Sequence, residues 1–284
     1  MPIAPIVTRL IPVTRLSRCY LPSIVPIRAF HTNNTHTTVH HHHSPVPVVP
    51  TGFTYIPGFL SQKEQLSLTR AALAHLDNVG PTAARRKQKR LIADGSVSID
   101  EHGFLPEDSC YEFEQGHFDG VIRHYREARI TDPQWASLDS DGELITILQR
   151  IKSLLPSVDT QCHVLHLSSR GEILPHIDNV DASGSIILGV SLGSARVLRL
   201  ESVGHQTTED GLPLYYELLL EPGSCYIQRL VANRSGDNNL AIYSLPSSDP
   251  VRYTHKHSIP KVPGTIHRGQ RLSIMMRDMP TPTS

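Results

Sequence analysis

Pro175-His176-Ile177-Asp178 is the stretch of the chain that says most about its fold. It leads into sequence whose aliphatic runs are separated by Gly and Pro, which is typical of β-strands. On an extended backbone, side chains two residues apart project from the same face. The stretch therefore predicts that His176 and Asp178 can hold one metal ion as neighbours.

The triplet His-x-Asp also occurs as His75-Leu76-Asp77 and as His117-Phe118-Asp119. The first closes a helical pattern, and the second stands at the entrance of another, over residues 118–128. In a helix, positions i and i+2 point about 200° apart, so neither pair is expected to share an ion. Only the third triplet is predicted to chelate a metal.

A second histidine would complete a set of two imidazoles and one carboxylate. Such a set holds a metal on one face and leaves other positions open, as in ferrous oxygenases. His255 and His257 are both candidates, because spacing alone does not choose between them. Arg271 and Arg277 are planar cations suited to a dicarboxylate co-substrate such as 2-oxoglutarate, although they could also be surface charges lying over apolar neighbours. Zinc accepts the same ligands, but a zinc site would leave both arginines unexplained.

The first half of the folded region is expected to be helical. Folding should begin near Thr51, and Ser61-Gln62-Lys63-Glu64 has the pattern of a capping box that opens a helix. A second helix is predicted over residues 143–155, which carry one apolar stripe. Residues 78–110 are polar and are expected to be irregular.

After Pro156 the pattern changes to that of β-strands. Helices followed by many short strands predict an α+β domain whose core is a sandwich or distorted barrel. In the last strand, residues with odd numbers from Arg271 to Arg277 share one face, and the apolar residues between them share the other. The face with Arg271 and Arg277 can line the polar open end of the sandwich or barrel, while the apolar face packs against helices. The predicted strands are residues 161–167, 185–192, 196–200, 215–220, 224–229 and 271–277.

The N-terminal residues have the composition of a mitochondrial transit peptide. The first acidic residue is Glu64, and four arginines precede residue 30. Acid-poor, Arg-bearing starts of this kind are typical of such peptides, although a disordered basic tail would look similar. We therefore expect a transit peptide over residues 1–30, a His/Thr/Pro-rich linker over 31–50, a folded domain over 51–279 with a loop insertion at 231–250, and a tail at 280–284. Prolines interrupt the apolar runs near the N-terminus, so no transmembrane span is expected.

Charge argues against nucleic acid as a partner. The chain has 27 basic and 27 acidic residues. Loss of residues 1–30 removes four arginines and no acid, which leaves a net charge of −4, a poor match to a phosphate backbone. The one basic run, over residues 85–90, is more often a solvated face or loop than a nucleic-acid site.

Several segments, in order, resemble the AlkB-like Fe(II)/2-oxoglutarate dioxygenases, and within them the mitochondrial AlkB homologue 7 subfamily. The resemblance covers residues 55–279. The segments are Tyr55-Ile56-Pro57-Gly58-Phe59-Leu60, residues 111–127, Arg170-Gly171-Glu172-Ile173-Leu174-Pro175-His176-Ile177-Asp178, Leu218-Leu219-Leu220-Glu221-Pro222-Gly223-Ser224, Arg252-Tyr253 with His257-Ser258-Ile259, and residues 268–277.

This resemblance implies a double-stranded β-helix, a jelly-roll-like core, with a metal in its open mouth. It implies that His176, Asp178 and His257 bind Fe(II), the interval from Arg252-Tyr253 favouring His257 over His255. Arg271 would bind the distal carboxylate of 2-oxoglutarate, and Arg277 would support the co-substrate near the metal. With O2 as the other co-substrate, the implied reaction oxidises a C–H bond and releases succinate and CO2, with no catalytic residue beyond the metal centre.

Two departures from the repair-type members bear on the substrate. Those members carry a co-substrate-contacting Tyr where this chain has Leu167, and residues 78–110 lack their aromatic-rich lid pattern, which base extraction requires. The subfamily resemblance implies a mitochondrial matrix enzyme acting on a protein or another non-repair substrate, with links to fatty-acid metabolism and programmed necrosis. A demethylase of mitochondrial RNA and a non-catalytic metal-binding interaction module are the alternatives.

Overall fold

The computed structural model describes residues 50, 52–156, 159–178, 186–203, 215–229, 255–261 and 269–279. The predicted transit peptide, nearly all of the predicted linker, the loop insertion at 231–250 and the tail lie outside these residues. Among the helices that the model describes, none is both long enough and apolar enough to cross a membrane.

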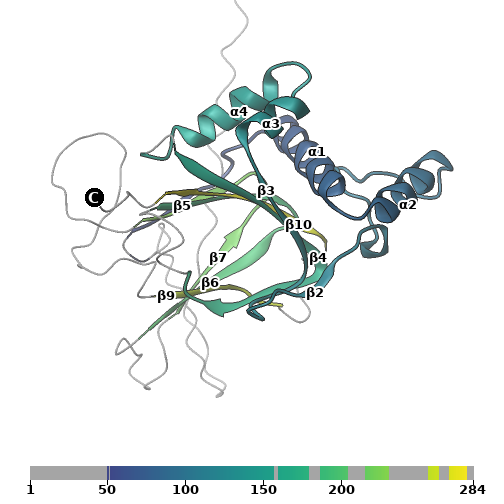
Figure 1. The fold of residues 1–284 in the computed structure, drawn as a ribbon. Helices are drawn as coiled ribbons and strands as arrows, with labels where there is room; N and C mark the ends of the chain where they lie inside the picture. Colours follow the sequence, from purple (N-terminus) through teal and green to yellow (C-terminus); the bar gives the residue numbers. More distant parts are fainter. Residues whose placement is uncertain are drawn as a thin grey trace, which may run out of the picture.

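The described strands form one curled antiparallel sheet (Figure 1). Their order is β1-β8-β5-β10-β4-β9-β6-β7, while β3 pairs with β4 and β2 pairs with β3. The strands are β1 Phe53–Ile56, β2 Glu114–Gly116, β3 Ile122–Ile130, β4 Thr160–His176, β5 Ile186–Gly193, β6 Arg196–Ser202, β7 Tyr215–Leu220, β8 Cys225–Arg229, β9 His255–Ile259 and β10 Arg271–Asp278.

The long strand β4 belongs to both layers of the curled sheet. Its first half pairs with β10, and its second half pairs with β9, with a register shift between Ile173 and His176. The backbone packs closely where β4 passes from one layer to the other. A Cβ added to Gly171 at this point would lie only 2.8 Å from the His124 carbonyl oxygen. His124 itself has a positive φ at a bulge in β3. This bend produces the predicted double-stranded β-helix.

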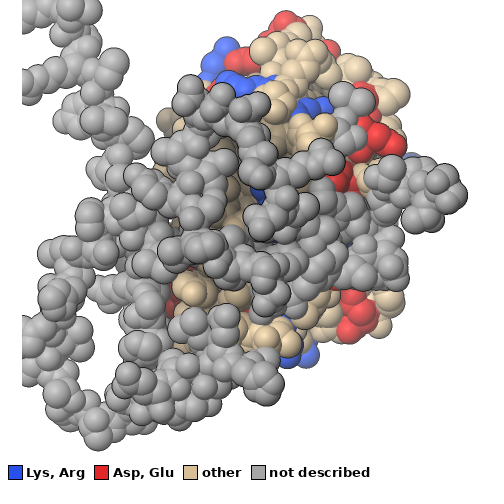
Figure 2. Space-filling view, turned by 90° about the vertical axis from the view of Figure 1, so that its left-hand side faces the viewer, with Lys and Arg blue, Asp and Glu red and all other residues tan. Residues whose placement is uncertain are grey.

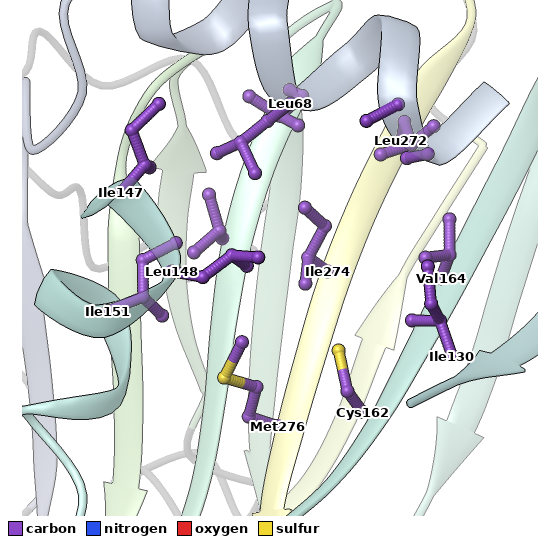
Figure 3. Packing of buried hydrophobic residues seen from close by; sticks show 14 of the residues in the cluster. Leu68, Ile130, Ile147, Leu148, Ile151, Cys162, Val164, Leu272, Ile274 and Met276 are labelled. Carbon is purple, nitrogen blue, oxygen red and sulfur yellow. The ribbon is translucent and has the colours of Figure 1, made fainter. Parts of the chain in front are cut away.

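Helices cover one layer of the sheet (Figure 1). They are α1 Gln62–Val79, α2 Thr82–Ala93, α3 Asp132–Leu138 and α4 Glu143–Lys152. The capping box predicted for α1 is present, since Ser61 accepts from the Glu64 backbone and Glu64 accepts from the Ser61 backbone. Figure 3 shows Leu272, Ile274 and Met276 of β10 facing Leu68 of α1 and the apolar stripe of α4, which contains Ile147, Leu148 and Ile151.

The other face of β10 points into the barrel, as the alternation of its residues predicts. Arg271 and Ser273 are each 1% exposed there, and the neighbouring interior positions of β4 are Leu165 and Leu167. Leucines of β6 and β7 close the interior from the opposite layer. A buried arginine therefore lies among largely apolar side chains in the barrel interior.

Two predictions about the first half of the chain are wrong. Residues 118–128 are not a helix, because their greater part lies in β3, which pairs with β4 and buries Tyr125. Cross-strand pairing here overrides the helix propensity of Arg, Glu and Ala. Residues 78–110 are not wholly irregular, because they contain α2. Only Gln88 of α2 is buried, so the helix has no apolar stripe to reveal it in the sequence.

Candidate metal centre and co-substrate pocket

His176, Asp178 and His257 converge on one point although they come from two strands and a loop. His176 ends β4 and is paired with His257 on β9, and the two ring centroids lie 4.1 Å apart. The Nε2 atoms of both histidines lie 3.8 Å from the Asp178 carboxylate. One ligand atom from each residue falls within 4.8 Å of the others. The backbone thus brings two imidazoles and a carboxylate within reach of a single ion.

A hydrogen bond selects the free nitrogen of His176. Its Nδ1 lies 2.9 Å from the Leu174 carbonyl oxygen, which can only accept. Nδ1 is therefore the donor, and in the neutral ring the lone pair is on Nε2, which faces Asp178. Backbone carbonyls commonly orient metal-binding histidines in this way.

The other candidate for the second histidine ligand, His255, lies apart from this group. His255 is buried beside Tyr216, and burial lowers its pKa. It is not in the group of His176, Asp178 and His257, which is the one such group found among the described residues.

The other two His-x-Asp triplets also lie apart from this group. His75 contacts the Arg129 carbonyl from within α1, as a helical position should. His117 and Asp119 lie in the turn after β2, where they form a 2.8 Å contact. The prediction that these two residues lie on a helix is therefore wrong. Their side chains contact each other, and His117 also contacts Glu127.

Arg271 is a cation buried without a carboxylate partner among the described residues. Its side chain donates from Nε to the Ser191 hydroxyl oxygen at 3.3 Å. Burial lowers the pKa of Arg271, and interaction with the Tyr226 phenol partly opposes this. The second buried arginine, Arg196, donates to the Gly269 and Ser168 carbonyls. Burial first, and then the nearby charge of Arg271, lower the pKa of Arg196 to about 10. Two cations thus create a positive potential at this end of the barrel.

Arg277 lies at the metal end of the same strand. Its Nη2 is 3.4 Å from Asp178 Oδ1, and its Nε is buried without a hydrogen-bond partner in the described part of the chain. Arg271 and Arg277 therefore lie on one face of β10, with Arg277 against the carboxylate of the candidate metal centre.

Tyr226 is a buried neighbour of Arg271 that the sequence did not reveal. Burial raises its pKa, and the charges of Arg271, Asp178 and Arg277 also act on its hydroxyl group. Leu167, by contrast, is fully buried opposite Arg271 on the neighbouring strand. The phenol beside Arg271 thus comes from β8, and only the pairing of β8 with β5, unknown from the sequence, could have identified it.

His163, which the sequence did not indicate, lies on the interior face of β4, opposite Met275 of β10. Burial, then Arg277 and Arg129, lower its pKa to about 4. The imidazole is therefore neutral near pH 7 and adds no charge to this wall.

Gly189 makes room for the Tyr226 ring. The two residues are paired across β5 and β8, and a Cβ on Gly189 would collide with the ring and hydroxyl of Tyr226. We expect Gly189→Ala to lower the free energy of unfolding by about 1–3 kcal/mol, as overpacked cores do. Chemical denaturation of this variant, Tyr226→Leu and the double variant tests the contact. The double variant should lose less than the sum of the singles, and strict additivity would contradict the collision.

Two relatives match most of the chain. The mitochondrial α-ketoglutarate-dependent dioxygenase AlkB homologue 7 of Mus musculus is 32% identical over 228 residues, which span 79% of this chain and 77% of the relative. The protein of the same name from Bos taurus is 32% identical over 210 residues, spanning 69% of this chain and 81% of the relative.

The solved structures with which the chain aligns are more distant. OsALKBH1 aligns with a TM-score of 0.43 at 12% identity, covering 82% of this chain and all of that one. A Pseudomonas putida prolyl-4-hydroxylase aligns with a TM-score of 0.38 at 12% identity, covering 81% and 94% of the two chains. No protein-family model matches the sequence. The identity to the two relatives, and the share of each that is covered, show that the chain belongs to the AlkB homologue 7 family of Fe(II)/2-oxoglutarate-dependent dioxygenases.

Proposed function

We propose that His176, Asp178 and His257 hold Fe(II), and that Arg271 binds the distal carboxylate of 2-oxoglutarate. Two neutral imidazoles and one carboxylate suit a ferrous ion and leave positions open for two co-substrates. The close approach of the three side chains and the free Nε2 of His176 support this assignment.

The buried charge of Arg271 is the observation that carries the co-substrate assignment. A guanidinium that is 1% exposed and interacts with the hydroxyl group of Ser191 and the phenol of Tyr226 is costly to bury unless an anion joins it. A dicarboxylate with one end at the metal supplies that anion. Arg277, whose Nε lacks a described partner, is available to the co-substrate at the metal end.

The iron, when bound with 2-oxoglutarate and O2, supplies the oxidation of a C–H bond and the conversion of 2-oxoglutarate to succinate and CO2. The chain's own residues orient and shield these groups. Leu174 fixes the His176 ring, and Arg277 holds the Asp178 carboxylate in place. Interior leucines such as Leu167 and Leu200 keep water out of the barrel interior.

We further propose that the enzyme works in the mitochondrial matrix and hydroxylates a protein side chain. Both relatives are named mitochondrial, and the N-terminal composition is that of a transit peptide. Loss of residues 1–30 would leave a net charge of −4, which is a poor match to a phosphate backbone, and Figure 2 shows acidic as well as basic side chains on the described part of one face. These features favour a protein over a nucleic acid as substrate. We also propose that the enzyme has the links to fatty-acid metabolism and programmed necrosis that the subfamily resemblance implies.

Substrate trapping tests this proposal. The protein is loaded with Mn(II) in place of iron and incubated in a mitochondrial extract, where it should retain its substrate. The substrate is then released and treated with the Fe(II) enzyme. Mass spectrometry measures the change in its mass. We expect a peptide that gains one oxygen atom. The His176→Ala protein is the matched control and should produce no gain. Recovery of RNA that loses a methyl group on treatment, or an equal gain with the control, would contradict a protein hydroxylase.

A further inference from the structure

A network of buried polar side chains crosses the apolar core close to the start of β10. His166 of β4 is fully buried, and Gln270, which directly precedes β10, is 5% exposed. The rings of Phe104, Tyr111 and Phe113 lie around the His166 imidazole, with centroids 5.0–5.3 Å from its own. Polar groups in such surroundings are costly to bury unless each of them is hydrogen-bonded.

The hydrogen bonds of this network run in one direction. The Arg126 guanidinium can only donate; its Nη1 lies 2.5 Å from the Asp77 carboxylate, and its Nε lies 3.0 Å from Nδ1 of His166. The proton of the neutral imidazole is therefore on Nε2, which donates to Oε1 of Gln270 at 3.0 Å. The Gln270 amide nitrogen in turn donates to the Leu105 carbonyl at 3.1 Å. Burial, and then the charge of Arg126, hold the pKa of His166 well below its ordinary value, so the ring stays neutral and the direction is kept.

The backbone just before Arg271 is also held in place. The Gly269 carbonyl accepts from Arg196 at 2.6 Å, and the Gln270 carbonyl accepts from the Ser194 backbone N–H at 2.9 Å. Successive residues of an extended backbone point to opposite faces, so the Gln270 side chain contacts β4 on the helix side while Arg271 projects into the barrel. Fixing Gln270 thus fixes the backbone from which the Arg271 side chain starts.

An apolar core does not need such a network for its stability. Replacing both partners of a buried hydrogen bond by apolar groups of the same shape is often nearly neutral, whereas a fully satisfied network specifies one arrangement of the groups that it joins. Here the specified arrangement is that of the backbone entering β10 at Arg271. A group that binds a reactant benefits from such support, because a displacement of about 1 Å can lower the rate about 100-fold.

We propose that His166 and Gln270 are positioning residues for the co-substrate, which hold the Arg271 guanidinium where it receives the distal carboxylate of 2-oxoglutarate. This role rests on the proposed binding of 2-oxoglutarate by Arg271. It extends that binding to two side chains on the helix-facing side of the sheet, which act through the backbone at Gln270. Their loss should weaken the binding of 2-oxoglutarate and leave the binding of the metal unchanged.

The melting temperature of the Mn(II)-loaded full chain, measured against the concentration of 2-oxoglutarate, gives the affinity without requiring turnover. Gln270→Met keeps the length of the side chain but removes its amide, so it should weaken 2-oxoglutarate binding about tenfold and leave Mn(II) binding within about twofold of the parent. His166→Phe, which suits the aromatic surroundings, should have a similar effect. The double variant should lose less affinity than the product of the two single effects, because both changes interrupt one network.

The Arg271→Leu background separates positioning from a general loss of structure. If Gln270 acts through the Arg271 guanidinium, Gln270→Met should weaken 2-oxoglutarate binding no further once Arg271 is replaced. An undiminished loss in this background, or parental affinity of the Gln270→Met single variant beside a large effect of Arg271→Leu, would overturn this proposal alone. Parental affinity of Arg271→Leu would instead overturn the proposed co-substrate site, and the positioning role with it.

His75→Phe is the matched control for His166→Phe. His75 is also a buried histidine, 4% exposed, and its Nε2 contacts the Arg129 carbonyl at 2.8 Å from within α1. Both substitutions should lower the melting temperature of the ligand-free protein, but His75→Phe should leave the affinity for 2-oxoglutarate unchanged. An equal loss of affinity in this control would show that weakened folding accounts for the effect, and would also overturn the positioning role.

Discussion

Replacing His176 by alanine is expected to abolish iron-dependent turnover. Without the His176 imidazole, Asp178 and His257 would supply only two ligand atoms, too few to occupy one face of the ion's coordination sphere. Loss of groups that merely orient metal ligands costs about 10–100-fold, so loss of a ligand should exceed about 100-fold. The measurement is succinate released from 2-oxoglutarate after anaerobic loading with Fe(II) and admission of O2, together with the iron retained by each protein.

His255 provides a matched control for this prediction. It lies two residues from His257 on β9 and is excluded from the converging group. His257→Ala should behave like His176→Ala, whereas His255→Ala should keep both iron and succinate production. The reverse result would place the distal ligand at His255. A parent protein that retains iron yet makes no succinate would indicate a non-catalytic metal-binding module.

Replacing Arg271 by leucine should raise the KM for 2-oxoglutarate by about 100-fold or more, because two charge-assisted hydrogen bonds to a carboxylate are lost. The affinity for Fe(II) should change little, since Arg271 does not contact His176, Asp178 or His257 in the described structure. Steady-state kinetics over a range of 2-oxoglutarate concentrations, with iron binding measured on the same samples, separates the two effects.

Stability provides a second readout for Arg271. Without co-substrate its charge is buried and uncompensated, so Arg271→Leu should not lower the melting temperature of the ligand-free protein. Adding 2-oxoglutarate with Mn(II) should raise the melting temperature of the parent, and this increase should be lost in the variant. Arg271→Lys keeps the positive charge but lacks the planar pair of N–H donors of the guanidinium. It should therefore have a higher affinity for 2-oxoglutarate than the leucine variant but a lower one than the parent. A leucine variant with unchanged KM and an unchanged ligand-induced increase would show that Arg271 does not bind the co-substrate.

The sequence predicts the second half of the fold well. Short apolar runs bounded by Gly and Pro identified the regions of β4, β5, β6, β7, β8 and β10, because each is buried on at least one face. The alternation in β10 also predicted which residues face the helices and which face the barrel. Local pattern is sufficient here because these strands are short apolar runs, with burial that alternates along β6 and is continuous along β5.

The first half shows where local pattern is insufficient. Residues 122–130 have helix-forming composition, but pairing with β4 makes them a strand. Helix α2 buries one residue, so it lacks the apolar stripe by which helices are recognised. Tyr226 and Gly189, which are 37 positions apart in the sequence, come together only through the pairing of β5 with β8, which no local signal encodes.

The most direct test is a crystal structure of the protein with Mn(II) and 2-oxoglutarate. We expect metal bonds from Nε2 of His176, a carboxylate oxygen of Asp178 and Nε2 of His257, with the guanidinium of Arg271 hydrogen-bonded to the far carboxylate of the keto acid. Metal bound through His255, or Arg271 pointing away from the keto acid, would contradict it.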